Sequence, residues 1–339
     1  MKPKLLSIFF ILLFVTLSAF MLEENPYFKI TSKDVIFKNP KGFPKPIYDL
    51  TKNKPSVEGF TLGRKLFYDP ILSVDYFTSC ATCHQQFAAF AHIDHPLSHG
   101  IGGKIGIRNV PALQNLIWKD AFMVDGGINH LDLQPISPIT SPTEMGENLP
   151  NVLKKLQADS TYRLMFYKAF KDSIITTEML MKSLSHFLSL MISSNSRYDK
   201  FVAGRETLSS IEQKGLKLFK SNCVSCHPPP LFTDNKYHNI GLKPDSTLKD
   251  RGRQAITSYK EDYFKFKTPS LRNVEMTYPY MHDGRFRNLK EVLNHYGANQ
   301  SCLKLSLDEY EKTQLIAFLK TLTDMEYLHD RRFADPNTY

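Results

Sequence analysis

The pentapeptide Cys-x-x-Cys-His occurs twice in this chain of 339 residues, first as CATCH and then as CVSCH. Its residues are Cys80, Cys83 and His84 in the first copy and Cys223, Cys226 and His227 in the second. The spacing is typical of c-type haem attachment, in which two thiols add to the haem vinyl groups and the next histidine ligates iron. A disulfide, a redox pair or a zinc site could use the same cysteines, but none of these requires the adjacent histidine. The sequence therefore predicts two covalently bound haem c groups.

Other phrases recur in the same order around the two pentapeptides. GRKLF and GLKLF precede them, and IRNVP and LRNVE follow, before a last pair, MVDGG and MHDGR. The pentapeptides begin 143 residues apart, which is the length of a domain rather than of a solenoid repeat. This order indicates a duplicated domain in which each copy carries one haem and one equivalent Asp-Gly turn.

Apolar residues at helical spacing predict helices at 151–170, 177–197, 209–220, 289–296 and 306–323. The stretches after each pentapeptide are rich in glycine and proline, so we expect long ordered loops around the haems. The chain length suits two domains. The sequence predicts a mostly α fold with two cytochrome c-like haem domains related by duplication, at 55–205 and 206–325.

Residues 1–22 predict export to the periplasm. Lys2 and Lys4 precede an apolar run that reaches about Leu22, as in a signal peptide, although an uncleaved membrane anchor is an alternative. The net charge of +9 comes from scattered basic residues, which indicates no nucleic-acid partner. The fifth cysteine, Cys302, is expected to be a buried thiol.

With these motifs the sequence resembles the bacterial di-haem cytochrome c peroxidases and their MauG-type relatives. The resemblance spans residues 57–322 and rests on LGRKLFYDP, SHGIGG, RNVPAL, DGG, PTEM, TPSLRN and YPYMHDG together with the pentapeptides. It implies that His84 is proximal to a haem that reacts with hydrogen peroxide. It also implies that His227 is proximal to a haem that relays electrons from a donor such as a small monohaem cytochrome c. Homodimers are usual in this family.

The resemblance assigns a peroxide pocket near the first haem. Glu144 in PTEM, with Gln134 upstream, matches residues that move a proton between the peroxide oxygens and stabilise the departing one. His99 matches a loop histidine that caps the first iron at rest and leaves on activation, and His95 is its alternative.

The resemblance also implies one calcium ion between the haems. Its protein ligands would be the Asn109 side chain and the carbonyls of Thr277 and Pro279, with waters completing the shell. The chain has no acidic cluster of its own that would demand calcium, and Asn109 could simply form a turn. The calcium assignment therefore rests on the resemblance alone.

Two positions depart from the peroxidases. Tyr296 stands where they have a second axial methionine, as in MauG-type enzymes, and a phenolate ligand lowers the potential of the iron. His295 and Met281 are the alternative ligands. Val124 replaces the family's inter-haem tryptophan, and because an aliphatic side chain cannot be oxidised, electrons would tunnel directly or pass another residue such as Trp118.

The sequence therefore predicts an exported cytochrome c peroxidase that reduces hydrogen peroxide to water with electrons from a small periplasmic redox donor. One alternative is a MauG-like oxidase that acts on a protein or small molecule through high-valent haem. Another is a non-enzymatic di-haem electron carrier, which would need no proton-transfer pocket such as that expected at Glu144.

Overall fold

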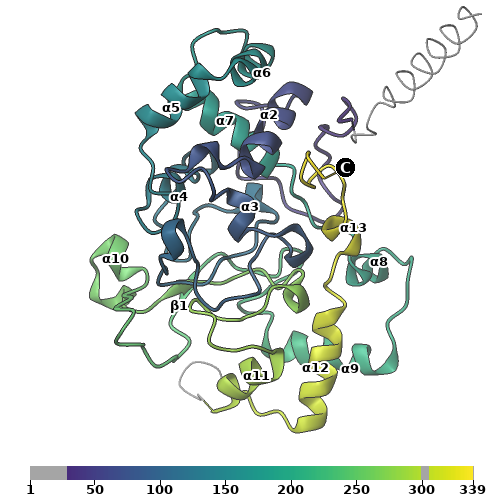
Figure 1. Cartoon of the computed structure of the whole chain (residues 1–339). Helices are drawn as coiled ribbons and strands as arrows, with labels where there is room; N and C mark the ends of the chain where they lie inside the picture. The colour runs from purple at the N-terminus through teal and green to yellow at the C-terminus, as the bar shows by residue number, and fades with distance from the viewer. Residues whose placement is uncertain (1–28, 299–304, 339) are drawn as a thin grey trace, which may run out of the picture.

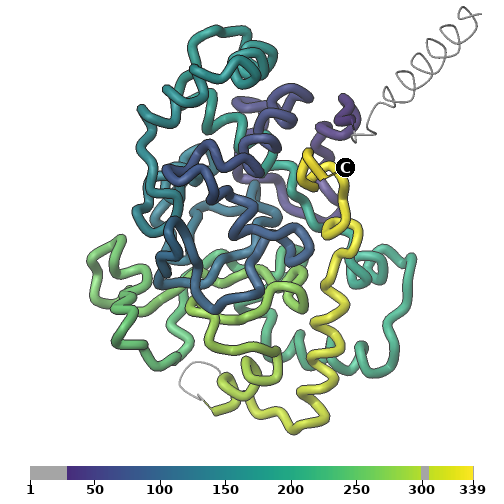
Figure 2. The backbone as a smooth tube through the Cα atoms, viewed as in Figure 1, coloured from purple at the N-terminus to yellow at the C-terminus, as the bar shows by residue number. Residues whose placement is uncertain are grey.

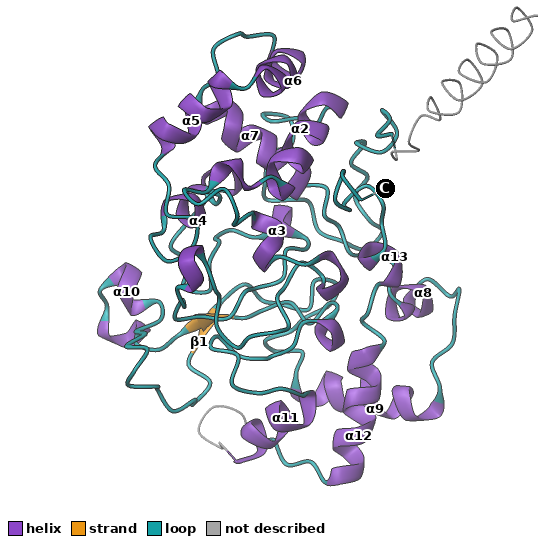
Figure 3. Cartoon of the chain, in the orientation of Figure 1, coloured by secondary structure: helices purple, strands orange, loops and turns teal. Residues whose placement is uncertain are grey.

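The computed structural model of the protein describes residues 29–298 and 305–338, so the predicted signal segment and Cys302 lie outside the described residues. Short helices surround a central body of loops (Figure 1; Figure 3). They are α2 (Val57–Tyr68), α3 (Cys80–Cys83), α4 (Ile136–Thr140), α5 (Leu149–Ala158), α6 (Ser160–Phe170), α7 (Thr177–Leu188), α8 (Arg197–Val202), α9 (Ser210–Asn222), α10 (Gln254–Thr257), α11 (Leu289–Ala298), α12 (Glu309–Lys320) and α13 (Met325–Leu328). Strand β1 (Tyr237–His238) pairs antiparallel with β2 (Phe266–Lys267). The predicted mostly α fold is confirmed, and no helix in the described ranges is long and apolar enough to cross a membrane.

The recurring phrases GRKLF and GLKLF lie in α2 and α9, each of which packs closely against a second helix. A Cβ atom on Gly63 of α2 would lie 2.0 Å from the Ser183 carbonyl oxygen of α7. A Cβ atom on Gly215 of α9 would lie 1.9 Å from the Gln314 carbonyl oxygen of α12. The same glycine therefore allows the same close helix pairing in the N-terminal half (residues 29–205) and in the C-terminal half (residues 206–324).

Two helix predictions were too long. The predicted helix at 151–170 is two helices, because the Asp159 carboxylate accepts hydrogen bonds from the Thr161 and Tyr162 N–H groups and starts α6. The predicted helix at 177–197 ends at Leu188, after which Ser193 exchanges hydrogen bonds with the buried Asn115 side chain. The other three predictions match α9, α11 and α12 to within three residues.

The chain beyond residue 324 returns to the N-terminal half, where its end lies beside the first residues described (Figure 2). Arg64 Nε donates to the Ala334 carbonyl at 2.6 Å, and the Tyr68 hydroxyl donates to the Phe333 carbonyl at 2.6 Å. The Phe333 ring is fully buried against Phe60 and Phe187. The segment after the predicted limit at 325 is therefore part of the N-terminal core.

We expect Gly215→Ala to lower the free energy of unfolding by about 1–3 kcal/mol, because its methyl group would overlap the α12 backbone. Lys217→Ala on the exposed face of the same helix is the control, with an expected change within about 0.5 kcal/mol. Chemical denaturation of the two holoproteins measures the difference. Equal stability of the two variants would show that the helices separate without cost.

Candidate functional site

The first pentapeptide forms one helical turn, α3, that ends at His84. The His84 N–H donates to the Cys80 carbonyl at 2.9 Å, and Nδ1 of the ring lies 2.6 Å from the Phe90 carbonyl oxygen. Because a carbonyl only accepts, Nδ1 carries the hydrogen and Nε2 keeps its lone pair for a metal. Burial lowers the pKa of His84 to about 4, so the imidazole is neutral, as a ligand must be.

The second pentapeptide repeats this geometry. The His227 N–H donates to the Cys223 carbonyl at 2.9 Å, and Nδ1 lies 3.0 Å from the Phe232 carbonyl oxygen. Burial lowers the pKa of His227 as well. Phe90 and Phe232, which supply the two carbonyls, both have positive φ, at 59° and 55°. Both halves therefore present a histidine in the tautomer that binds iron.

The four cysteines of the pentapeptides form no disulfide bond. Burial raises the pKa of Cys80 and Cys223 to about 12 and that of Cys83 to about 11, whereas redox cysteines have lowered values. Within the described ranges, the one group of three side chains close enough to hold a metal is Cys226, Asp234 and His238, which has no counterpart at the first pentapeptide. The shared geometry of the two motifs thus fits covalent haem better than zinc or a redox pair.

Glu144 lies beside the first pentapeptide. Its charge contributes to the raised pKa of both Cys80 and Cys83, and burial raises the pKa of Glu144 itself. The Glu144 carbonyl accepts the Ile101 N–H at 2.8 Å, and a Cβ atom on Gly100 would lie 2.5 Å from Glu144 Cα. The loop that carries His99 is therefore held against Glu144.

Gln134 belongs to the segment that is hydrogen-bonded to the neighbour of Glu144. It lies four residues before Pro138, whose carbonyl accepts the N–H of Met145, the neighbour of Glu144, at 3.2 Å. The Ser137 N–H also donates to the Gln134 carbonyl at 3.3 Å. The two predicted catalytic residues thus come from adjacent segments joined by backbone hydrogen bonds.

Three histidines cluster on the loop after the first pentapeptide. The ring centroids of His92 and His95 are 5.1 Å apart, and those of His95 and His99 are 4.1 Å apart. The carbonyl of His99 accepts from the Cys83 thiol at 3.3 Å. His95 and His99 are therefore both placed near the first haem motif. His92 was not predicted as a site residue, although three histidines within eight residues indicate a cluster.

The predicted calcium residues come from two segments that meet. The Asn109 N–H donates to the His282 carbonyl at 2.7 Å, and the Asn109 side-chain amide donates to the Pro96 carbonyl at 2.8 Å. Pro279 lies three residues before His282, and the Thr277 hydroxyl donates to the Val274 carbonyl at 3.4 Å. Calcium at this place stays a prediction.

The two Asp-Gly turns close in the same way and join the two halves. Phe122 pairs with Ile128 around the first turn, and Tyr280 pairs with Phe286 around the second. The Val124 carbonyl accepts the N–H of Lys267 in β2 at 2.7 Å, just as the second turn accepts from Asn109. Each turn therefore contacts the opposite half of the molecule.

Arg108 links the halves beside these turns. Its guanidinium contacts Asp125 at 2.5 Å and Asp250 at 2.7 Å, and the Asp250 side chain is only 3% exposed. Behind it, the ring of His282 stacks on Phe266 with centroids 3.8 Å apart. Arg108 lies in the recurring phrase IRNVP, but the sequence did not reveal its partners, which lie 17 and 142 residues away.

The aromatic residues considered for electron transfer differ in their surroundings. The Trp118 indole donates to the Pro44 carbonyl at 2.8 Å and packs on Phe43 at 5.2 Å, so it is part of the core. Tyr296 is partly buried against the apolar cluster of the C-terminal half, which Cys223 also borders. The neighbouring His295 directs Nε2 to the Ile240 carbonyl at 2.9 Å.

Comparison with known proteins agrees with this arrangement. Residues 57–207 match the di-haem cytochrome c peroxidase family. The chain is 34% identical to the methylamine utilization protein MauG of Methylophilus methylotrophus, over 84% of this chain and 87% of that protein. It is also 34% identical to the cytochrome c551 peroxidase of Nitrosomonas europaea, over 77% and 79% of the two chains.

A solved structure is similar over almost its whole length. It is the crystal structure of a MauG-like protein associated with microbial copper homeostasis, with a TM-score of 0.82 and 31% identity. The alignment covers 89% of this chain and 99% of that one. The likeness therefore extends over both halves of the chain.

We expect Arg108→Ala to destabilise the protein by about 3–5 kcal/mol, because it leaves two carboxylates near the junction without their cation. Arg197→Ala removes an arginine that is more exposed and also pairs with two carboxylates, and it should cost about 1 kcal/mol or less. Adding Asp250→Asn to the Arg108 variant should recover part of the loss, as measured by chemical denaturation. Equal losses in the two arginine variants would contradict a structural role for Arg108 at the junction.

Proposed function

Because this chain belongs to the di-haem cytochrome c peroxidase family, we propose that it reduces hydrogen peroxide to water with electrons from a small redox protein. Cys80, Cys83 and His84 would hold the haem that supplies the iron for peroxide, and Cys223, Cys226 and His227 would hold the haem that supplies the electrons. The observation that carries this proposal is the partly buried Glu144 beside the first pentapeptide, which a pure electron carrier would not need.

The reaction consumes two electrons and two protons for each peroxide and forms two waters. The haem supplies the iron that binds peroxide. Glu144 exchanges a proton with the peroxide oxygens, and the burial that raises its pKa brings that pKa closer to the working pH. Gln134, on the adjacent segment, stabilises the departing oxygen by hydrogen bonding.

Access to this pocket depends on the loop that carries His99. The loop is closed by backbone hydrogen bonds from Gly106 to Ser98 and from Gly100 to Lys104, both within 2.9 Å. A Cβ atom on Gly102 or Gly103 would meet no neighbouring atom, so the tip of the loop is not packed against the rest of the chain. In this proposal His99 caps the first iron at rest and leaves when its loop separates from Glu144, and His95 is the alternative cap.

A second candidate function, a MauG-like oxidase of a protein or small molecule, is favoured by Tyr296. We propose that this tyrosine is the second axial ligand of the iron held by His227, where a phenolate favours oxidised states of the iron. The similarity to the MauG of Methylophilus methylotrophus supports this reading as strongly as the similarity to the peroxidase of Nitrosomonas europaea supports the first.

Further parts of the proposal concern the setting of the enzyme. We propose that residues 1–22 direct export to the periplasm, and that one calcium ion binds near Asn109, Thr277 and Pro279. The two halves would then be separate haem domains joined by their Asp-Gly turns, in a protein that forms homodimers, as the resemblance to the family implies.

We expect Glu144→Gln to lower kcat for peroxide by about 100- to 10,000-fold, because proton transfer is lost while the shape of the pocket remains. Glu178→Gln, an exposed site on α7, is the control and should retain full activity. Peroxide consumption with a small reductant measures both. Full activity of the Glu144 variant would assign proton transfer to another group.

The same variant gives a second readout, which is independent of catalysis. Burial raises the pKa of Glu144 in the folded protein above its ordinary value of 4.5. As the pH rises, the unfolded chain therefore loses this proton before the folded protein does, and the free energy of unfolding falls. Glu144→Gln should therefore gain stability relative to the wild type between pH 4 and pH 7, as followed by thermal denaturation. A constant difference across this range would contradict the burial of the carboxyl group.

We expect Tyr296→Phe to change the absorption spectrum and raise the reduction potential of the second haem, because an anionic ligand is removed. Tyr310→Phe is the matched control on α12, where the tyrosine is 61% exposed. Spectroelectrochemistry of the holoproteins measures both properties. An unchanged spectrum in the Tyr296 variant would exclude the tyrosine as an iron ligand and return Met281 to consideration.

A further inference from the structure

Helix α9 exposes three lysines on one face and ends at the second pentapeptide. Lys214, Lys217 and Lys220 follow one another at intervals of three residues and are all exposed, so they project from the same side of the helix. The opposite side packs on α12 through Leu216 and Phe219 (Figure 1). The lysine row therefore leads along the surface to the haem-binding cysteines.

These three lysines are not neutralised. Within the described part of the chain, no ion pair or hydrogen bond involves their ammonium groups, and Lys214 only approaches the Tyr310 ring at 5.9 Å. The nearby carboxylate of Glu212 is bound by Arg197 at 2.6 Å, and that of Asp234 is bound by His238 at 2.9 Å. The face consequently carries a net positive charge, in contrast to the lysines of α12, which pair with glutamates.

The row ends at apolar and small residues that lie between the two haem-binding thiols. Val224 is 37% exposed, and Ser225 beside it is exposed as well. The surface before the first pentapeptide is different, because residues 69–79 contain no lysine or arginine and expose Phe77 to 81%. The segment before the second pentapeptide therefore carries exposed lysines that lead to an exposed part of the motif, whereas residues 69–79 before the first pentapeptide carry none.

We propose that Lys214, Lys217, Lys220 and Val224 form the docking surface for the acidic face of a small redox protein, which exchanges electrons with the haem held by His227. This inference rests on the proposed function and adds the charge of the partner to it. Complementary charge raises association rates by about 10- to 1,000-fold at low salt, and the apolar centre lets the partner approach the haem edge closely. Salt weakens such steering, because the Debye length is only about 10 Å at 0.1 M.

The test is the triple variant Lys214→Glu/Lys217→Glu/Lys220→Glu, measured by electron exchange without peroxide. The reduced holoprotein is mixed with oxidised plastocyanin, a small acidic copper protein, or with oxidised mitochondrial cytochrome c, a small basic one. We expect the wild type to react faster with plastocyanin at low salt and to slow as salt is added. The triple variant should react with plastocyanin about 10- to 100-fold more slowly and should favour cytochrome c.

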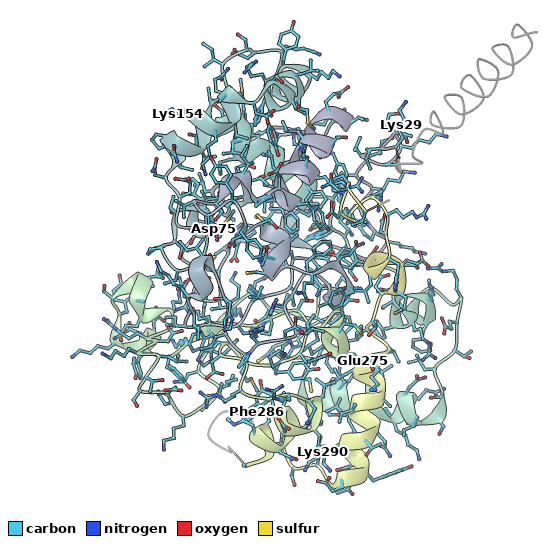
Figure 4. All side chains as sticks on the ribbon, in the orientation of Figure 1. Lys29, Asp75, Lys154, Glu275, Phe286 and Lys290 are labelled. Carbon is cyan, nitrogen blue, oxygen red and sulfur yellow. The ribbon has the colours of Figure 1, made fainter. Side chains whose placement is uncertain are left out.

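The control, Lys154→Glu/Lys168→Glu/Lys171→Glu, makes the same change in net charge near α5 and α6, at the other end of the molecule (Figure 1; Figure 4). It should alter the plastocyanin rate by less than about threefold. If the two triple variants slow equally, net charge rather than this face steers the partner, and the docking surface is wrong. Peroxide reduction by the wild type with hydroquinone, a neutral reductant, is measured separately. Its absence would overturn the proposed function, while the plastocyanin result would still decide the docking surface.

Discussion

The function of the two haem motifs depends on the hydrogen bond from each pentapeptide histidine to a backbone carbonyl. His84 is held by Phe90 and His227 by Phe232, each at the tautomer that leaves Nε2 for iron. Both phenylalanines have a positive φ, which a residue with a bulky side chain rarely adopts. The surrounding cores, which bury both phenylalanine rings completely, hold that conformation in place. The helix pairs closed by Gly63 and Gly215 support these cores in the same way in each half.

The two halves are joined by the two Asp-Gly turns, one in each copy of the duplicated domain. Each Asp-Gly turn accepts a backbone hydrogen bond from the other half, at the carbonyls of Val124 and His282. A Cβ atom on Gly284 would lie 2.3 Å from the Pro96 carbonyl oxygen. Val124 therefore holds the junction through its backbone, which any residue could provide. A tryptophan at this position is thus not needed for the contact, and the junction is kept with valine.

Local chemistry was predictable from the sequence, and long-range contacts were not. The haem motifs, the fold class and the helices α9, α11 and α12 followed from spacing and periodicity, which depend on near neighbours. Asp159 ended a helix through its own side chain, a capping signal that periodicity alone overlooks. The contacts of Arg108 and of Phe333 join residues that are far apart in the sequence, so local patterns do not predict them. Glu144 was reached by resemblance, and the structure adds its burial and its closeness to Cys83.

The most direct test of the account is a titration of the fully reduced holoprotein with hydrogen peroxide, in which both haem spectra are followed. Two ferrous haems hold the two electrons that one peroxide consumes. The account predicts that one equivalent of peroxide oxidises both haems, with electrons from the haem at His227 passing to the site at His84. Haems that remain ferrous in excess peroxide, or a holoprotein that carries fewer than two covalent haems, would contradict it.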